Sequence, residues 1–270
     1  MSAPSMRRRD DHAAEVALPG EGEPHADRPA GAAARRRAAA ANGQRQLEVM
    51  ASAPAIDAWY FDQLAPHVHG DVLEVGAGLG SLSARILGKA RSLTATEVDE
   101  ALLARLAARF AGDARVQVHG YDLEAETPPE LAAQRFDVVF SCNVLEHLAD
   151  DALATRRLVR LLRPGGWFLA YVPAVPWAFG SIDAAVGHHR RYTKATLRAL
   201  VEGAGLRVAH LEAMNLLGLA GWLVNGRLLR RSGPAPGQLA LFERLVPLLR
   251  ALERRPPPLG LGLVVHARLG

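Results

Sequence analysis

Three histidines stand where they could exchange a proton with a bound molecule. His147 follows an apolar segment over residues 136–141, and His188 and His189 precede a predicted helix at 194–204. Imidazole has the side-chain pKa nearest neutrality, so each could be the base that deprotonates an acceptor hydroxyl. His147 could equally hydrogen-bond its own loop and cap the next helix, and a neutral amine acceptor would need no base. The histidines therefore indicate acid–base chemistry without deciding which of them performs it.

A glycine-rich turn supplies the second set of candidate residues. It follows residues 72–75, a β-branched apolar run that predicts a buried strand. Glycines at alternate positions let the backbone turn sharply and approach a ligand, and the helix that begins near Ser81 offers unpaired N–H groups. Glu97 ends a second predicted strand about twenty residues after the turn begins, where such folds place a carboxylate on ribose hydroxyls. The cofactor-binding residues expected in the turn itself are Glu74, Gly76, Ala77, Gly78 and Gly80.

The residue that follows this turn narrows the choice of family. A dinucleotide-binding turn needs glycine or alanine where Ser81 stands, which disfavours a dehydrogenase. The pattern Glu-x-Gly-x-Gly-x-Gly over 74–80 instead resembles motif I of the class I S-adenosylmethionine-dependent methyltransferases. Asn-Val-Leu-Glu-His-Leu at 143–148 and Leu-Arg-Pro-Gly-Gly at 162–166 also resemble this family. The resemblance implies that the cofactor is S-adenosyl-L-methionine and that the turn encloses its methionine end.

The resemblance also implies the remaining contacts to the cofactor. It suggests that Asp122 accepts a hydrogen bond from the adenine amino group with Tyr121 or Leu123 against the ring face, although Asp122 could be an ordinary turn residue. It places Asn143 beside the methionine portion. Some quinone O-methyltransferases carry a carboxylate at the position of Asn143 and use a divalent metal there, so we expect no metal in this protein.

The acceptor pocket is predicted from a dense polar cluster after the fifth strand. Gly-His-His-Arg-Arg-Tyr at 187–192 resembles a signature that one broad group of methyltransferases carries at the edge of the acceptor pocket. We therefore expect Arg191, Tyr192 and the upstream Trp177 to bind the acceptor. A solvated basic turn is the alternative, and residues 173–187 are expected to be loop-like.

Strands and helices alternate along the chain, which predicts an α/β fold. The expected fold is Rossmann-like and doubly wound, with a mostly parallel seven-stranded sheet, helices on both faces and a helical insertion before the last strand. This insertion, residues 213–258, could cap the acceptor site, form a dimer surface or contact a membrane peripherally. Trp59 and Tyr60 lie in a helical pattern ahead of the first strand, where they could line the cleft or pack that helix onto the sheet.

Domain boundaries follow from composition. Residues 1–45 are rich in Ala, Arg, Gly and Pro and hold few large apolar side chains, so we expect a disordered tail. Residues 46–270 are expected to form the methyltransferase domain.

Charge and cysteine content exclude several classes of protein. The chain has 270 residues, one cysteine and a sequence pI near 9.7. A single cysteine excludes an internal disulfide and a multi-cysteine zinc site, and it fits a cytoplasmic protein. Residues 1–46 carry 8 arginines and 6 acids, which leaves 24 basic residues and 22 acids elsewhere, so no basic footprint for nucleic acid is present. Residues 216–224, the longest apolar stretch, are too short to span a membrane.

The predicted reaction is transfer of a methyl group to a small-molecule acceptor by a monomer or homodimer. A hydroxyl of a secondary metabolite, lipid or sugar-type substrate is the favoured acceptor; N-methylation and an inactive cofactor-binding scaffold are the alternatives. Nucleobase amino-methyltransferases carry Asn/Asp-Pro-Pro-aromatic after the fourth strand. The Ser-Cys-Asn-Val at 141–144 argues against that class.

Overall fold

The computed structural model describes residues 42–45, 47–48, 53–233 and 237–270. Residues 1–41 of the predicted tail lie outside the described residues. Residues 42–45 are helical, so the expected disorder does not extend as far as residue 45.

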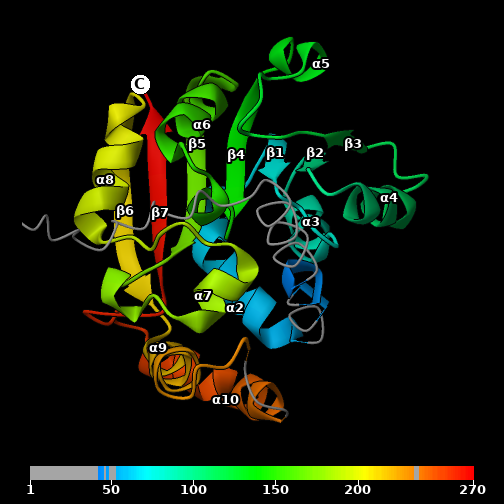
Figure 1. The fold of residues 1–270 in the computed structure, drawn as a ribbon. Coiled ribbons are helices and arrows are strands. Elements are labelled where there is room, and N and C mark those ends of the chain that lie inside the picture. The colour runs from blue at the N-terminus through cyan, green and yellow to red at the C-terminus, as the bar shows by residue number, and fades with distance from the viewer. Residues whose placement is uncertain (1–41, 46, 49–52, 234–236) are drawn as a thin grey trace, which may run out of the picture.

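A seven-stranded sheet runs through the centre of the molecule (Figure 1). The strand order is β3-β2-β1-β4-β5-β7-β6; β1 to β5 are parallel to one another, and β7 is antiparallel to both β5 and β6. The central strands are apolar along their length because helices cover both faces of the sheet. This arrangement confirms the predicted Rossmann-like, mostly parallel sheet. The strands are β1 Asp71–Val75, β2 Ser92–Glu97, β3 Val116–Gly120, β4 Phe136–Cys142, β5 Leu162–Pro173, β6 Leu206–Met214 and β7 Gly262–Leu269.

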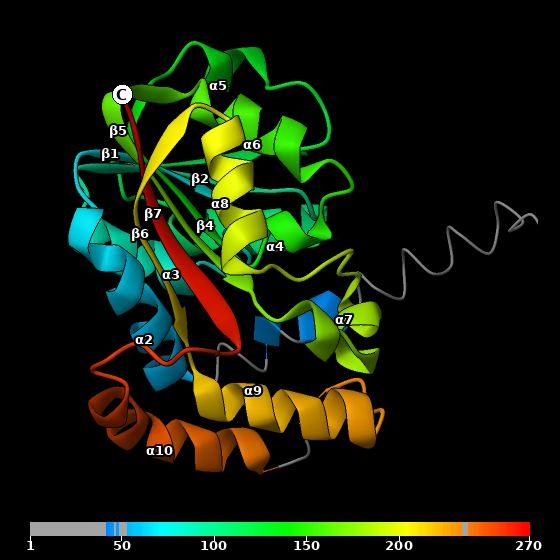
Figure 2. The same cartoon turned by 90° about the vertical axis from the view of Figure 1, so that its left-hand side faces the viewer.

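Helices pack on both faces of the sheet and create two hydrophobic cores (Figures 1 and 2). The helical elements before the insertion are α2 Pro54–Leu64, η1 Ala65–His67, α3 Ser81–Leu87, α4 Glu100–Arg109, α5 Pro129–Ala132, η2 Leu145–His147, α6 Asp151–Val159, η3 Pro176–Ala178, α7 Ser181–Val186 and α8 Lys194–Gly203. One core includes Leu158 of α6 and Leu197 of α8. The other includes Trp59 of α2 and Ile86 of α3. Both cores lie between the helices and the faces of the sheet. Loops, and not core side chains, therefore occupy the ends of the strands.

The predicted helical insertion is present at one end of the molecule (Figure 2). It contains α9 Leu216–Trp222, the π-helical η4 Leu223–Leu228 and α10 Gln238–Leu252. Val246 and Leu249 of α10 are buried in the same core as α2. Among the described residues, none of the helices has the length and hydropathy needed to cross a bilayer.

Two local expectations are settled by the structure. The segment 173–187 is not all loop, since it contains η3 and α7; the Asp183 carboxylate accepts the Gly180 N–H at 2.9 Å and so caps α7. These elements are too short to leave a periodic pattern in the sequence. Trp59 and Tyr60 are buried, and Tyr60 stacks on Tyr171 with ring centroids 4.5 Å apart, so both pack α2 onto the sheet.

Candidate active site

Neighbouring strand ends bring the predicted cofactor residues to one edge of the sheet. Val75, the last residue of β1, pairs with Thr96 of β2 and Ser141 of β4. Glu97 pairs with Gly120 at the end of β3. In open α/β sheets, ligands bind outside the carboxyl ends of the strands. The residues that leave the sheet at this edge are the glycine turn, Glu97, Asp122 and Asn143.

The glycine turn has a backbone shape that only glycine adopts easily. Gly76, Gly78 and Gly80 have φ angles of 65°, 55° and 76°. A Cβ atom at Gly76 would lie 2.5 Å from Val144 Cγ2, and one at Gly80 would lie 2.7 Å from the Phe110 ring. The turn is therefore packed tightly on its protein side, and its three glycines add no side chain that could obstruct a ligand.

Two residues of the motif support the turn from within. The Ala77 N–H donates to the Thr96 carbonyl at 2.9 Å. Glu74 is buried and accepts a hydrogen bond from Ser83 Oγ at 2.5 Å. Burial, opposed in part by that hydrogen bond, raises the pKa of Glu74 to about 8. Glu74 is thus largely protonated at neutral pH and ties the turn to α3.

Glu97 is a fixed, buried carboxylate. Its Oε2 accepts the Gly78 N–H at 2.9 Å, and its Oε1 accepts the N–H groups of Val98 at 2.8 Å and Asp99 at 3.0 Å. A carboxylate has about four lone-pair positions, so it can accept a further hydroxyl donor. A rigid carboxylate beside a glycine-rich turn fits the ribose and methionine portions of S-adenosyl-L-methionine.

The other predicted cofactor residues follow β3 and β4, at the same edge of the sheet. Asp122 is exposed and accepts the Glu124 N–H at 2.9 Å, while Leu123 is buried. Asn143 is exposed with φ of 53°, a left-handed conformation that asparagine tolerates better than most residues. Asp122 thus makes the hydrogen bond of an ordinary turn residue, which was the alternative to adenine binding. It also lies at the edge of the sheet where a ligand would bind.

A short helical segment lies across this edge, and the sequence did not predict it. Asn42 Nδ2 donates to the Ala185 carbonyl at 3.1 Å, and Gln44 Nε2 donates to Asp99 at 3.0 Å. Leu47 Cδ1 would lie 3.2 Å from a Cβ atom at Gly78. Polar residues in an alanine- and arginine-rich stretch gave no periodic signal for this segment, which bridges α7, α4 and the glycine turn.

The histidines of the sequence prediction belong to two segments that pack together. The His189 N–H donates to the Glu146 carbonyl at 2.7 Å, which joins the segment after α7 to η2. The rings of His147 and His188 meet edge to face with centroids 4.7 Å apart. His188 Nε2 lies 3.8 Å from Glu146 Oε1, a gap wider than a direct hydrogen bond.

Asp183 organises this cluster, and sequence reasoning missed it. Its Oδ1 lies 2.8 Å from His188 Nδ1 and 2.8 Å from Arg191 Nε, and its Oδ2 accepts the Trp222 indole N–H at 3.0 Å. Burial alone would raise the pKa of Asp183, but the hydrogen bond from His188 and the charge of Arg191 outweigh it and hold that pKa below its usual value. The only signal in the sequence was an acid five residues before the histidine pair.

The other two cluster members differ in exposure: Glu146 is fully buried, whereas His147 is exposed. Burial raises the pKa of Glu146 to about 8, although the charge of Arg191 opposes the shift. Desolvation by surrounding protein atoms, followed by the influence of His188, lowers the pKa of His147 to about 4. Within the described part of the chain, neither Glu146 carboxyl oxygen has a hydrogen-bond partner, and Arg191 Nη2 has none either. Such buried polar atoms are costly unless a bound molecule satisfies them.

The remaining predicted acceptor residues lie in different surroundings. Arg191 is buried, and its Nη1 donates to the Ala174 carbonyl at 2.9 Å. Tyr192 is buried, and its hydroxyl donates to Asp151 at 2.7 Å. His189 is exposed, and Trp177 is 58% exposed on η3. The structure thus brings His147 and His188 together and turns Arg191 and Tyr192 toward internal partners.

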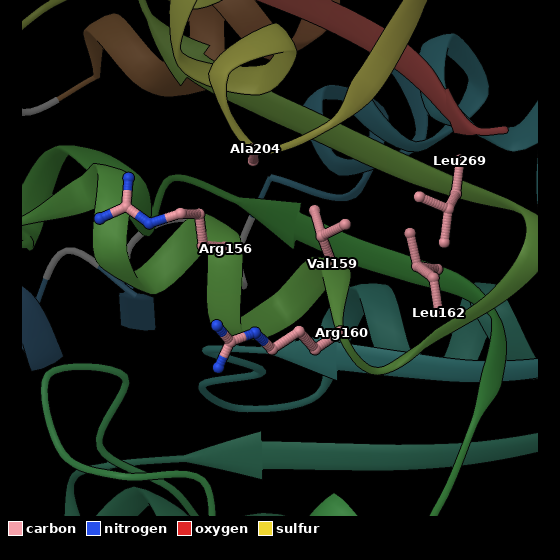
Figure 3. Close-up of a pocket in the computed structure, with 6 residues that line it drawn as sticks. All are labelled: Arg156, Val159, Arg160, Leu162, Ala204 and Leu269. Carbon is pink, nitrogen blue, oxygen red and sulfur yellow. The ribbon is translucent and has the colours of Figure 1, made fainter.

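A separate surface hollow lies at the opposite edge of the sheet (Figure 3). It is formed where α6 ends, β5 begins and β7 ends. None of the predicted site residues lines it. Its lining residues are Arg156, Val159, Arg160, Leu162, Ala204 and Leu269.

Comparisons with known sequences agree with this geometry. A family model described as a methyltransferase domain matches residues 73–168. A protein of Mycolicibacterium smegmatis named as a probable S-adenosylmethionine-dependent methyltransferase is 36% identical over 151 residues, which cover 55% of this chain and 56% of that protein. The ubiquinone biosynthesis O-methyltransferase of Pseudomonas paraeruginosa is 31% identical over 170 residues, which cover 59% of this chain and 72% of the relative. The match thus spans little more than half of the first relative.

Solved structures share the fold at low sequence identity. The crystal structure of an S-adenosylmethionine-dependent methyltransferase from Mesorhizobium loti superimposes with a TM-score of 0.54 and 19% identity, covering 77% of this chain and 95% of that one. At such identity the likeness concerns the fold alone.

Proposed function

This chain belongs to the class I S-adenosylmethionine-dependent methyltransferases, and we propose that it methylates a hydroxyl group of a small-molecule acceptor with His188 as the general base. The 2.8 Å contact between Asp183 Oδ1 and His188 Nδ1 carries this proposal. A carboxylate at Nδ1 keeps the proton on that nitrogen, which leaves Nε2 as the acceptor of a proton. Asp183 also stabilises the imidazolium that forms when Nε2 takes the hydroxyl proton.

His147 and His189 are weaker candidates for the base. His147 is exposed, and no carboxylate among the described residues hydrogen-bonds to its ring as Asp183 does to that of His188. His189 is exposed, and its backbone N–H, rather than its ring, makes the contact with Glu146. His147 instead fixes one edge of the His188 ring, so we assign it a positioning role.

Glu146 supports a place for the acceptor hydroxyl. Its unpartnered carboxyl group lies 3.8 Å from His188 Nε2, and a hydroxyl between the two groups would satisfy both. With a pKa near 8, Glu146 is mostly neutral at pH 7 and can donate a hydrogen bond to the acceptor oxygen. Arg191 and Tyr192 hold Asp183 and Asp151 in place, so we propose that they position the site and do not contact the acceptor, contrary to the sequence expectation.

The cofactor residues have a separate task. S-adenosyl-L-methionine, when bound, supplies a methyl group that is already activated by its sulfonium sulfur. We propose that Glu97 binds the ribose hydroxyls, that Gly76 to Gly80 accommodate the methionine portion, and that Asp122, Leu123 and Asn143 complete the site. Holding the acceptor oxygen in line with the methyl group can supply a large share of the rate.

Two other functions remain as alternatives to test. N-methylation of a neutral amine needs no base, so it would not explain the Asp183–His188 pair. An inactive scaffold binds no acceptor, so it would not explain the unpartnered carboxyl group of Glu146. The O-methyltransferases among the relatives also favour oxygen as the acceptor atom. We propose secondary metabolites, lipids and sugars as the acceptor classes to screen. We also expect the protein to act as a monomer or homodimer and not to bind nucleic acid.

The test is a screen of hydroxyl and amine metabolites with isotopically labelled methyl donor. We expect label on an oxygen atom of at least one hydroxyl compound, with its position determined by NMR. Transfer to nitrogen alone would favour N-methylation. Calorimetric binding of the cofactor with no transfer to any compound would favour the scaffold.

A further inference from the structure

The insertion, residues 213–258, has an outward surface that is both apolar and cationic. In α10, Leu241, Leu248 and Leu252 recur at helical spacing and are 60%, 56% and 70% exposed. The other side of the same helix, which includes Val246, is buried against α2. The exposed leucines are thus a second apolar stripe that packing within the described chain does not use.

A matching stripe continues on the neighbouring helix. Leu217, Val224 and Leu228 of α9 and the π-helical η4 are 43%, 43% and 76% exposed, and these three residues make up the second stripe. The two helices lie side by side at the same end of the molecule in both views (Figures 1 and 2). Exposed apolar side chains concentrated at one end mark an interaction surface more often than scattered ones do.

Arginines outnumber acidic residues in this insertion. Residues 213–258 contain seven arginines and two glutamates. Glu243 turns inward and accepts two backbone N–H groups at the start of α2, at 2.5 and 3.2 Å. Glu253 does the same at the start of α9, at 2.7 and 2.8 Å. No acidic side chain among the described residues pairs with Arg230, Arg244, Arg254 or Arg255.

We propose that this surface docks on an anionic phospholipid membrane, independently of the acceptor that the active site uses. Leucines of the two stripes enter the boundary between headgroups and acyl chains, and the arginines bind lipid phosphates. Trp177 adjoins this surface, because its carbonyl accepts a hydrogen bond from Arg227 at 2.7 Å. An exposed tryptophan is well suited to the interfacial layer of a membrane.

The same charges disfavour the other occupants. A two-fold contact between two copies would place arginines against arginines, with no acid on this surface to compensate. Residues 1–41 offer little to cover the leucines, because their large apolar side chains are only Met1, Met6, Val16 and Leu18. An anionic lipid surface satisfies both the leucines and the arginines.

Co-sedimentation with lipid vesicles tests the proposal without reference to catalysis. The full chain is mixed with vesicles of phosphatidylcholine alone or with added phosphatidylglycerol, at low and high salt. We expect binding to the anionic vesicles that weakens with salt. The double variants L228S/L252S and R244E/R254E should each lower that binding by about tenfold or more. The matched control L153S/R135E changes an exposed leucine and an exposed arginine outside the insertion, and it should bind like the wild type.

Three results would overturn the proposal. These are absence of wild-type binding to anionic vesicles, equal loss in the control and insertion variants, and binding that neither insertion variant changes. Sedimentation without vesicles adds a fourth: a dimer of the wild type that L228S/L252S abolishes would identify a second copy as the occupant. Thermal melting of each variant shows that a loss of binding is not a loss of folding.

Discussion

His188 Nδ1 lies 2.8 Å from Asp183 Oδ1, and both side chains are almost completely buried. This contact fixes the Nδ1 edge of the imidazole ring and leaves Nε2 directed at Glu146. Three further groups hold the same carboxylate: the Arg191 guanidinium, the Trp222 indole and the Gly180 N–H. The base of the proposed reaction is therefore held by the segment that follows β5 and by the first helix of the insertion.

Replacing Asp183 by Asn should impair catalysis more than cofactor binding. The amide is nearly the same size but cannot hold the His188 proton on Nδ1 or stabilise the imidazolium, so kcat should fall by roughly 10²–10⁴-fold. The dependence of kcat on pH should also shift, which loss of packing alone would not cause. A variant that melts like the wild type and keeps its kcat and pH profile would show that Asp183 is only structural.

Glu97→Ala should weaken cofactor binding. Loss of a charge-assisted hydrogen bond costs about 1.5–3 kcal/mol, so calorimetry should show affinity reduced by roughly tenfold to a hundredfold. Glu130→Ala, at an exposed position of α5, is the matched control and should bind normally. Unchanged affinity in a folded Glu97→Ala protein would remove Glu97 from the cofactor site.

Two glycine-to-alanine changes should alter stability in opposite directions. Gly76→Ala introduces a Cβ 2.5 Å from Val144 at a positive φ, so the free energy of unfolding should fall by about 1–3 kcal/mol. Gly203→Ala lies at the end of α8, where nothing stands within 4 Å of the new atom, and should raise it by up to about 1 kcal/mol. Urea unfolding measures both. A neutral Gly76→Ala change would show that the turn relaxes more easily than its packing indicates.

The buried Glu146 should make stability depend on pH. Its pKa rises from 4.5 to about 8 on folding, so the folded state holds a proton that the unfolded state releases. Its favourable contribution is complete below about pH 4.5 and is lost as pH rises toward 8. Glu146→Gln mimics the neutral form, so its melting temperature relative to wild type should increase between pH 5 and pH 9, roughly the window of the shift. Parallel melting curves across that range would place the Glu146 pKa near its ordinary value.

The sheet and the cofactor edge could be predicted because their signals are local. Apolar runs such as 72–75 and 136–141, followed by turns at regular intervals, specify parallel strands, and the glycine turn with Glu97 specifies what lies at their ends. The predicted helix after Thr193 is also present, and the Thr193 hydroxyl accepts the Thr196 N–H at 3.1 Å.

The acceptor side could be predicted only in part because its contacts are distant in sequence. Nothing local to Asp183 shows that it binds both His188 and Trp222, residues from two different segments. Arg191 and Tyr192 belong to a motif that lies, as expected, at the ligand-binding edge of the sheet. The direction of the Arg191 side chain depends on Asp183, and that of Tyr192 depends on Asp151. Sequence position thus identified the cluster, and the contacts of Asp183 support our proposal that His188 is the base and that its neighbours position it.

The most direct measurement is the turnover of His188→Ala beside His189→Ala on one identified acceptor, with cofactor affinity determined for both. We predict that His188→Ala lowers kcat by roughly 10²–10⁴-fold and leaves cofactor affinity nearly unchanged. His189→Ala, one position further along the chain and exposed, should keep most of the wild-type kcat. Full turnover by His188→Ala would contradict histidine-assisted O-methylation at this site.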